Sequence, residues 1–206
     1  MTIDHIGVIL YPDQSAFRII GRLALPLFSY LLIFGVENTR NIKKYFTRLF
    51  SFAIISQIPY VIVHGYKPLE RLNIFFTHSI SVLFVQNPLF LLIPIFASLV
   101  IPFEFSLYGF ALMAFMNILK DNAKFGVTFW VLLEVLTHVL STLLIWKYQI
   151  FSLLALPLIL LHKNGVLRIE RNVEGETIYP AWRKYFFYIY YPLHLILLYL
   201  IKNYFF

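Results

Sequence analysis

The sequence predicts an all-α integral membrane protein, a bundle of about eight or nine transmembrane helices, some of them short or kinked. Three observations support this prediction: 60% of the 206 residues are hydrophobic, only 13% are charged, and the mean hydropathy is +0.77. Soluble domains carry about 25% charged residues and about half apolar ones, so a soluble domain is excluded. A fibrous or disordered chain is excluded as well, because Gly and Pro are few and no short period recurs.

A membrane helix with its loop uses roughly 20 to 25 residues, so residues 1–206 fit one transmembrane domain without a separate soluble one. Hydropathy and helix breakers place the helices near residues 1–11, 15–35, 45–63, 72–86, 88–102, 105–119, 127–146, 150–161 and 185–202.

Several of these segments are too short or too interrupted to be simple spans. The first, MTIDHIGVILY, rises only about 16 Å as a helix. It is either part of a longer reading frame or a half-helix that ends inside the bundle. Segment 88–102 contains Pro88, Pro94 and Pro102, which predict a kink or break. The short segments 72–86 and 150–161 either tilt little or are half-helices that line a cavity.

The basic residues predict the topology. If the 36–44 loop is cytoplasmic, alternation of the helices puts ten basic residues inside and four outside, in agreement with the positive-inside rule. The inner ones are Arg40, Lys43, Lys44, Lys120, Lys124, Lys163, Arg168, Arg171, Arg183 and Lys184, and the outer ones are Lys67, Arg71, Lys147 and Lys202. The polar loop near 162–184 then lies on the cytoplasmic side and the C-terminus outside. The net charge of +7 is accordingly read as membrane topology rather than nucleic-acid binding.

Several chemistries lack support in the sequence. The chain has no cysteine, which excludes a disulfide framework, a thiolate zinc site and a cysteine nucleophile. It contains no Gly-rich phosphate loop, no HExxH and no GxSxG motif. Its histidines lie on different segments, so we expect no metal site.

Ionisable residues within the apolar segments cost about 2.5 to 3.5 kcal/mol each, and they therefore mark candidate functional positions. His5 in an apolar pocket would be a competent general base. The adjacent Asp4 projects about 100° away and is expected to pair with an arginine, Arg22 being the candidate. The alternative is that Asp4 caps a helix end and His5 merely packs.

Arg18 and Arg22 are four residues apart on one helix face, so an anion between or beside them is expected. The candidates are Asp4, a lipid phosphate and the phosphates of a cofactor; alternatively, Arg18 extends to the membrane surface. Two further pairs share a helix face. Asn73 with Thr77 suggests hydrogen bonds between helices, and Glu134 with His138 suggests a structural pair.

Several motifs occur together in one order: IDHIG at 3–7, IGRLALPLFSYLLIFG at 20–35, ENTRN at 37–41, KYFTRL at 44–49, ISQIPY at 55–60, LNIFFT at 72–77 and YYPLHL at 190–195. With these motifs the sequence resembles the TraX family, densely over about the first 85 residues and more loosely in the last helix. That family is named for a plasmid conjugation protein that acetylates the N-terminus of pilin. The resemblance implies a multi-pass protein of the bacterial cytoplasmic membrane and an acyltransferase that uses acetyl-CoA.

Carried onto this chain, the family motifs fall on Asp4, His5, Gly21, Arg22, Pro26, Thr39, Arg40, Arg48, Gln57, Pro59, Asn73, Thr77, Pro192 and His194. From the residues and the resemblance together we expect a catalytic group and a cofactor-binding group. The catalytic group is His5 as general base with Asp4, and Asn73 or Thr77 as donor to the oxyanion. The cofactor-binding group, which holds the phosphates of acetyl-CoA, is Arg22, Arg40, Arg48 and Arg18.

The acceptor is expected to be an amine or hydroxyl of a peptide, glycan or lipid, and the lipid bilayer is the other partner. Two different functions compete with acyl transfer. One is a small transporter in which Asp4, His5, Glu134 and His138 relay protons or substrate. The other is a structural subunit of a membrane complex, in which Arg18 and Arg22 meet an acidic partner.

Overall fold

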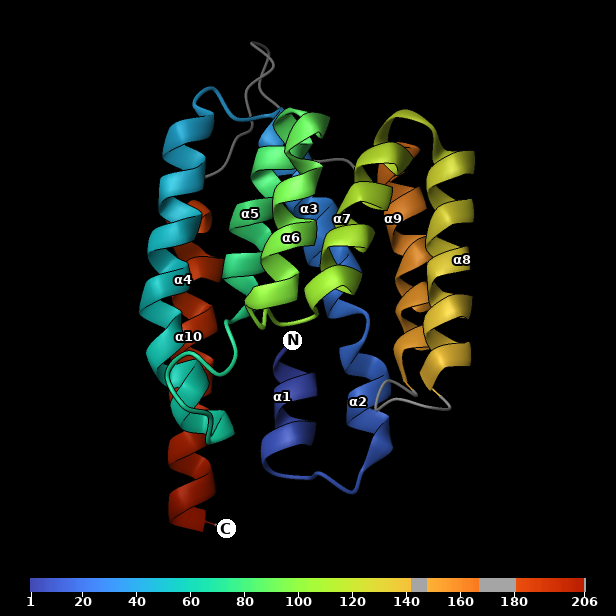
Figure 1. The fold of residues 1–206 in the computed structure, drawn as a ribbon. Helices are drawn as coiled ribbons and strands as arrows, with labels where there is room; N and C mark the ends of the chain where they lie inside the picture. Colours follow the sequence, from blue (N-terminus) through green and yellow to red (C-terminus); the bar gives the residue numbers. More distant parts are fainter. Residues whose placement is uncertain (142–147, 167–180, 206) are drawn as a thin grey trace.

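The structure, a computed structural model, describes residues 1–141, 148–166 and 181–205, which form a helical bundle (Figure 1). The elements are α1 (Thr2–Ile9), α2 (Ser15–Gly21), α3 (Ala24–Glu37), α4 (Ile42–His64), α5 (Ile74–Gln86), η1 (Pro88–Leu91), α6 (Leu92–Val100), α7 (Ser106–Asp121), α8 (Ala123–Ser141), η2 (Gln149–Ala155), α9 (Leu156–Lys163) and α10 (Ala181–Phe205). An isolated parallel bridge between Leu72 and Phe103 is the sole β-type pairing in these ranges. The predicted all-helical class is confirmed.

Four helical stretches of the described chain are long and apolar enough to cross a membrane: Ser15–Glu37, Ile42–His64, Ala123–Leu140 and Tyr185–Phe205. The predicted count of eight or nine spans is not confirmed. Helices α5 and α6 have 13 and 9 residues. They rise about 20 and 14 Å, well short of a hydrocarbon core of about 30 Å. In Figure 1, α5, α6 and α7 occupy one half of the bundle's height, and α1 and α2 occupy the other.

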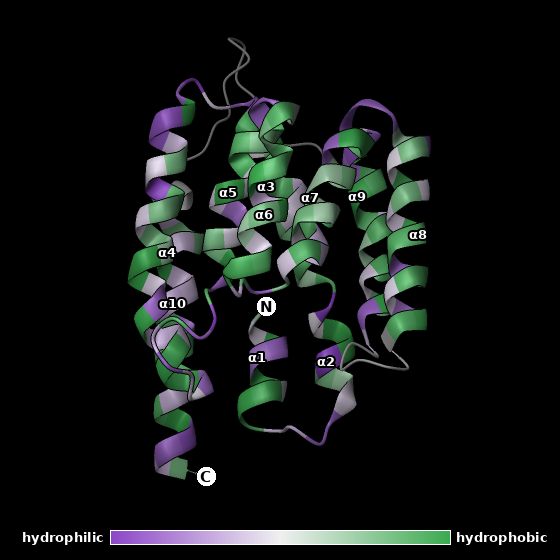
Figure 2. Ribbon diagram, in the orientation of Figure 1, coloured by the Kyte–Doolittle hydropathy of each residue, from purple (hydrophilic) through white to green (hydrophobic). Residues whose placement is uncertain are grey.

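The hydropathy of the surface agrees with a membrane protein. Figure 2 shows apolar residues over most of α6 and α8, whereas hydrophilic residues gather in the connecting loops, with isolated stretches on α1, α2, α4 and α10. Large side chains that face outward from these helices include Phe96, Leu99, Leu132 and Val139. Exposed apolar surface of this extent is unusual in a soluble protein and suits contact with lipid.

Prolines explain where the helices break. The helix predicted over 15–35 is interrupted at Arg22 and Leu23, because Pro26 lacks the amide proton for the Arg22 carbonyl and its ring crowds that carbonyl. The predicted break in 88–102 is confirmed, since the segment starts with η1 and continues as α6. The short turn at Arg22 leaves this arginine at a helix junction in the middle of the bundle.

Two apolar cores hold the bundle together. The larger core joins α3, α4, α5, α7, α8, η2 and α9, and Trp130 and Met113 are among its fully buried side chains. The smaller core joins α1, α4 and α10 and consists of Ile9, Tyr60, Val63, Tyr191, Leu195 and Leu198. The two cores are separate clusters, and the residues between them line a cavity.

Loops that the charge pattern assigned to one side meet at one end of the bundle. Lys120 Nζ lies 3.3 Å from Glu37 Oε1, and Lys163 Nζ donates to the Lys120 carbonyl at 2.6 Å. Which end faces the cytoplasm stays a prediction. Residues 167–180 of the predicted polar loop and residues 142–146 of the helix predicted over 127–146 lie outside the described residues.

Candidate functional site

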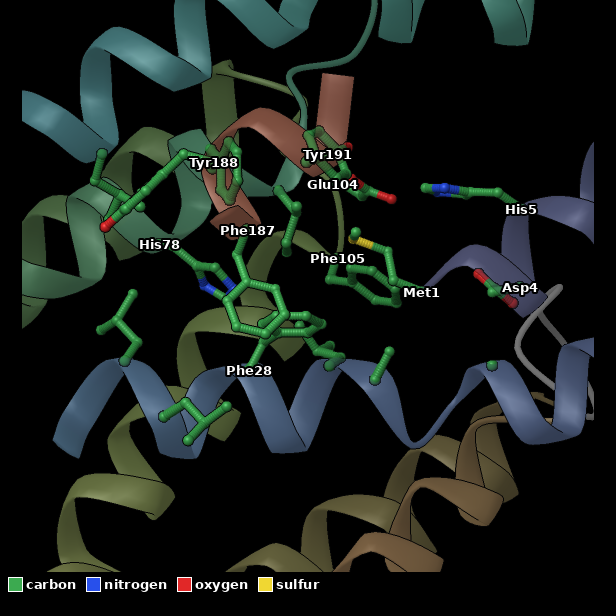
Figure 3. Close-up of a pocket in the computed structure, with 18 of the residues that line it drawn as sticks. Met1, Asp4, His5, Phe28, His78, Glu104, Phe105, Phe187, Tyr188 and Tyr191 are labelled. Atoms are coloured by element: carbon green, nitrogen blue, oxygen red, sulfur yellow. The ribbon is translucent and has the colours of Figure 1, made fainter. Parts of the chain in front are cut away.

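A cavity of about 340 Å³ lies between the two cores, and seven helical elements and the α6–α7 link contribute to its wall. Most of the wall is apolar, with Phe28, Phe105 and Phe187 among its larger side chains (Figure 3). The polar lining residues are Asp4, His5, Arg22, Tyr45, Arg48, His78, Glu104, Gln149, Tyr188 and Tyr191. Apolar walls with a few polar groups are typical of a small-molecule site, and the volume falls in the usual range of about 300 to 1,000 Å³.

Asp4 forms ion pairs with two arginines, Arg18 on α2 and Arg22 at the junction between α2 and α3. Arg18 Nη1 donates to Asp4 Oδ1 at 2.7 Å, and Arg22 Nη2 lies 3.8 Å from the same oxygen. The contact requires Gly21, because a Cβ at that position would collide with the Asp4 side chain. The prediction that an anion lies between the arginines is confirmed, and the anion is Asp4. Arg18 itself does not line the cavity. It contributes to the site through its ion pair with Asp4.

His5 projects from α1 into a cluster of rings on α4 and α10. Its Nδ1 lies 2.8 Å from His194 Nε2, and its ring meets the edge of His64 with centroids 5.8 Å apart. Helix α1 is not one of the candidate membrane spans. Burial, together with the positive charge that His194 and His64 would carry, lowers the pKa of His5 well below its usual value. The imidazole is therefore neutral near pH 7 and free to accept a proton.

Arg22 begins a hydrogen-bond chain that leads away from the cavity. Its Nη1 donates to Gln149 Oε1 at 3.2 Å, and Gln149 Nε2 donates to the Tyr108 hydroxyl at 2.7 Å. The Tyr108 hydroxyl in turn donates to Glu134 Oε1 at 2.5 Å. Every link points the same way, from the arginine cation toward the buried carboxyl group. The chain therefore sets the orientation of the Arg22 guanidinium in the cavity wall.

Arg48 is held by aromatic faces. Its guanidinium carbon lies 5.3 Å from the ring centroids of Tyr45 and Tyr188 and 5.8 Å from that of Tyr185. Its buried Nε has no hydrogen-bond partner, and no ion pair holds the guanidinium within the described chain. Cation–π contacts keep such a side chain in place while leaving its charge available to an anion.

Two predicted site residues serve the fold, and this corrects the sequence-based expectation. Asn73 Nδ2 donates to the Ala53 carbonyl at 2.8 Å and to Gln57 Oε1 at 2.9 Å, so both amide hydrogens are used. The Thr77 hydroxyl donates to the Glu104 carbonyl at 2.9 Å. Neither residue lines the cavity. An oxyanion role does not fit this geometry, because no donor of either side chain is left for a ligand.

Arg40 lies in the exposed link between α3 and α4 and does not line the cavity. Of the eight residues expected to form the site, the structure brings Asp4, His5, Arg22 and Arg48 to one cavity. Arg18 reaches the site through its contact with Asp4, and the other three residues lie elsewhere.

Asn73→Ala is expected to lower the free energy of unfolding by about 3 kcal/mol, because it removes the buried hydrogen bonds to the Ala53 carbonyl and to Gln57 and the N-cap of α5. Thermal unfolding of the purified protein in detergent measures this change. Ser98→Ala, at a half-buried position of α6 whose hydroxyl donates to a carbonyl of its own helix, is the control and should change little. An unaltered melting temperature with a large loss of turnover per folded molecule would instead restore the oxyanion role.

Glu104 is a cavity residue that sequence reasoning missed. The backbone of the α6–α7 link positions it: Leu72 N donates to the Pro102 carbonyl at 3.0 Å, and Glu104 N donates to the Leu72 carbonyl at 2.8 Å. The next two residues, Phe105 and Ser106, have φ of 61° and 37°, which is a costly conformation for residues with a Cβ. In Figure 3 the carboxyl group extends toward His5. The signal in the sequence was an acid between two phenylalanines after a proline.

The charge state of Glu104 depends on its surroundings. The residue lies outside the candidate membrane spans. Burial and the charge of Asp4 raise the pKa of Glu104 to about 7. Its Oε2 is buried and has no hydrogen-bond partner. A carboxyl group of this kind exchanges a proton near neutral pH and has an oxygen available to a polar ligand.

Unpaired polar atoms are concentrated around the cavity. Nine buried side-chain atoms of the described chain have no hydrogen-bond partner, and five of these belong to lining residues. The five are Arg22 Nε, Arg48 Nε, His78 Nδ1, Glu104 Oε2 and the Tyr191 hydroxyl. Since buried polar atoms are normally paired, this concentration indicates a site built for a ligand with several polar groups.

Comparison with known proteins adds independent information. A family model described as TraX protein matches residues 1–202. A probable fimbrial assembly protein FimC, serogroup H1, of Dichelobacter nodosus is 29% identical over 96% of this chain and 89% of its own length. An uncharacterized protein of Rickettsia prowazekii (strain Madrid E) is 45% identical over 28% of this chain and 21% of its own length. No solved structure matches.

Proposed function

The chain belongs to the TraX family, and from that premise we propose that it is a membrane-embedded acyltransferase. It moves an acetyl group from acetyl-CoA to an amine or hydroxyl of a cell-envelope acceptor. The relative from Dichelobacter nodosus is named as a fimbrial assembly protein, which favours a pilin or another surface protein as acceptor. The observation that carries the proposal is the single cavity that contains a neutral imidazole, His5, and two arginines, Arg22 and Arg48.

His5 acts as the general base of the proposed reaction. It takes the proton of the acceptor N–H or O–H while the acceptor atom attacks the thioester carbonyl carbon. The new bond to carbon forms as the carbon–sulfur bond breaks, and the proton then passes from His5 to the leaving thiolate of coenzyme A. In this proposal transfer is direct, and an acyl-enzyme thioester is excluded because the chain has no cysteine.

Arg22 replaces Asn73 and Thr77 as the proposed donor to the oxyanion. It lines the cavity, its Nε has no partner in the described chain, and Gln149 and Asp4 hold its two Nη groups. A donor that is oriented beforehand stabilises the negative charge that develops on the carbonyl oxygen. In this proposal Asp4 helps to orient the Arg22 guanidinium and does not itself touch the reacting atoms.

Arg48 is the proposed anchor for a phosphate of coenzyme A. It lies toward the same end of α4 as Lys43 and Lys44, and the exposed Arg40 precedes that helix. If the phosphates bind at this end, the narrow pantetheine arm of coenzyme A extends into the apolar cavity. Arg40 then contributes by attracting the anionic cofactor, an effect that salt weakens.

Arg48→Ala is expected to raise the KM for acetyl-CoA by about 10- to 100-fold with a small effect on kcat, because one charged hydrogen bond contributes about 1.5 to 3 kcal/mol. Steady-state assays over a range of acetyl-CoA concentrations measure this change. Lys124→Ala, at an exposed position of the same end of the bundle, is the control. A KM within about twofold of the wild-type value would remove Arg48 from the binding site.

The proposal is tested with the purified full chain in detergent or nanodiscs. We expect time-dependent release of coenzyme A from acetyl-CoA when an acceptor is added. Mass spectrometry of cell-envelope proteins, glycans and lipids from cells with and without the chain should show one acetyl group on the acceptor. If acetyl-CoA neither binds nor is consumed, and no acetylated species depends on the chain, a transporter or a structural subunit is the better interpretation.

A further inference from the structure

We infer that His194 is a positioning residue: it holds His5 in the tautomer that keeps a lone pair on Nε2. The base role of His5 rests on the proposed function, but the tautomer is a property of the folded chain and is measured without any reaction. His194 lies in α10, far from α1 in the sequence, and its side chain meets His5 through a buried hydrogen bond.

The donor and acceptor in the bond between His5 and His194 follow from the Tyr190 carbonyl, which can only accept. His194 Nδ1 lies 2.9 Å from the Tyr190 carbonyl oxygen, and a carbonyl only accepts, so the proton is on His194 Nδ1. A neutral imidazole carries one N–H, which leaves His194 Nε2 as an acceptor. His5 Nδ1, 2.8 Å away, must then be the donor. The single proton of neutral His5 is on Nδ1, and Nε2 carries the lone pair.

The surroundings keep both imidazoles neutral. No carboxylate forms an ion pair with either ring within the described chain. The titratable and charged groups that face His5 are the Met1 amino group at the start of α1, Asp4 on α1, Arg18 on α2, His64 on α4, Glu104 in the α6–α7 link, and Tyr191 and His194 on α10. Asp4 is already paired with Arg18, so its charge is not available to stabilise an imidazolium.

Contacts on both sides of the pair prevent the rings from turning away. His194 stacks on Tyr190 with centroids 5.2 Å apart, and its ring plane is inclined by 14° to that of His5, which suits an in-plane hydrogen bond between the two imidazoles. One turn earlier on α1, Thr2 Oγ1 lies 2.7 Å from the Tyr190 hydroxyl. Thr2 with His5 and Tyr190 with His194 each share a helix face, so the two helices meet in one register. His5 Nε2 has no protein partner in the described chain, and His5 lines the cavity.

The opposite arrangement has a distinct signature. A protonated His194 would donate from Nε2 to His5 Nδ1, and neutral His5 would then carry its proton on Nε2. In that state the lone pair of His5 is on Nδ1 and accepts from His194, so none is left for the proton of an acceptor, and the inference is wrong. The two arrangements differ in which ring nitrogen of His5 is protonated, which nitrogen-15 NMR distinguishes directly.

The first experiment determines the tautomer in the wild-type full chain, with histidine ring nitrogens labelled and the protein in micelles at neutral pH. The His5 signals are identified by their disappearance in His5→Gln. We expect a protonated Nδ1 and an unprotonated Nε2 for His5. A protonated Nε2 overturns the inference, whether or not the chain proves to be an acyltransferase.

The second experiment uses kinetics. His194→Phe keeps a stacked ring but removes the acceptor, and we expect kcat to fall about 100-fold with the KM for acetyl-CoA changed less than about threefold. His194→Gln offers an amide oxygen to His5 Nδ1 and should recover activity to within about tenfold of wild type.

His162→Phe is the matched control, because His162 is bonded to Tyr30 near the end of α9 and does not line the cavity. It should leave kcat unchanged. Equal losses in His194→Gln and His194→Phe, or a loss below about threefold in His194→Phe, would overturn the inference. If His194→Phe does not fold, the tautomer of the wild-type chain and the activity of His194→Gln still decide it. A wild-type chain without acetyl transfer refutes the proposed function alone.

Discussion

His5→Gln is expected to lower kcat for acetyl transfer by about 100- to 10,000-fold, the usual contribution of a general base, while acetyl-CoA still binds. The physical reason is that His5 keeps an unpaired ring nitrogen beside Asp4 and Arg22 in the cavity wall, whereas glutamine cannot take a proton at neutral pH. Binding of a labelled acetyl-CoA and turnover per folded molecule are measured on the same preparation, with His162→Gln as control.

The pH dependence gives an independent check on His5. Because burial lowers the pKa of His5, the base stays unprotonated through neutral pH, and kcat should fall only on the acid side of the usual imidazole value of about 6.5. The same shift makes the unfolded chain bind more protons than the folded one, so acidification below that value also lowers stability. Retention of full activity in His5→Gln would end the proposed mechanism.

Glu134→Ala is expected to lower the free energy of unfolding by about 3 to 5 kcal/mol. Glu134 Oε1 accepts hydrogen bonds from Tyr108, Trp130 Nε1 and Ser152 Oγ, and all four side chains are buried. Alanine would remove the acceptor that the three donors share and open a cavity beside Trp130. Unfolding of the purified protein by titration with a denaturing detergent measures the loss.

Two variants sharpen this measurement. Glu134→Gln keeps an acceptor oxygen and should lose much less stability than Glu134→Ala. Thr128→Ala, on the exposed face of the same helix, should stay within about 0.5 kcal/mol of wild type. A loss below about 1 kcal/mol for Glu134→Ala would mean that the three donors find other partners.

Features that depend on residues close together in the chain could be predicted from the sequence alone. The long apolar segments predicted α4 and α10, and Pro88, Pro94 and Pro102 predicted the break in 88–102, because hydropathy and proline act within a few residues. The spacing of Arg18 and Arg22 predicted a shared anion for the same reason. The interruption of the 15–35 helix before Pro26 was not predicted. Helix number was less predictable, since a 13-residue apolar helix such as α5 looks like a short span in sequence.

Contacts between segments that are far apart in the sequence could not be predicted from the sequence alone. The sequence by itself determined a helical membrane chain with a histidine, an aspartate and several arginines in its apolar part. Only the tertiary structure decided that His5 meets His194, that Glu104 reaches the cavity, and that the amide of Asn73 is already used. Composition and periodicity act locally, whereas the tautomer of an imidazole or the availability of an amide depends on which partner the fold brings to it.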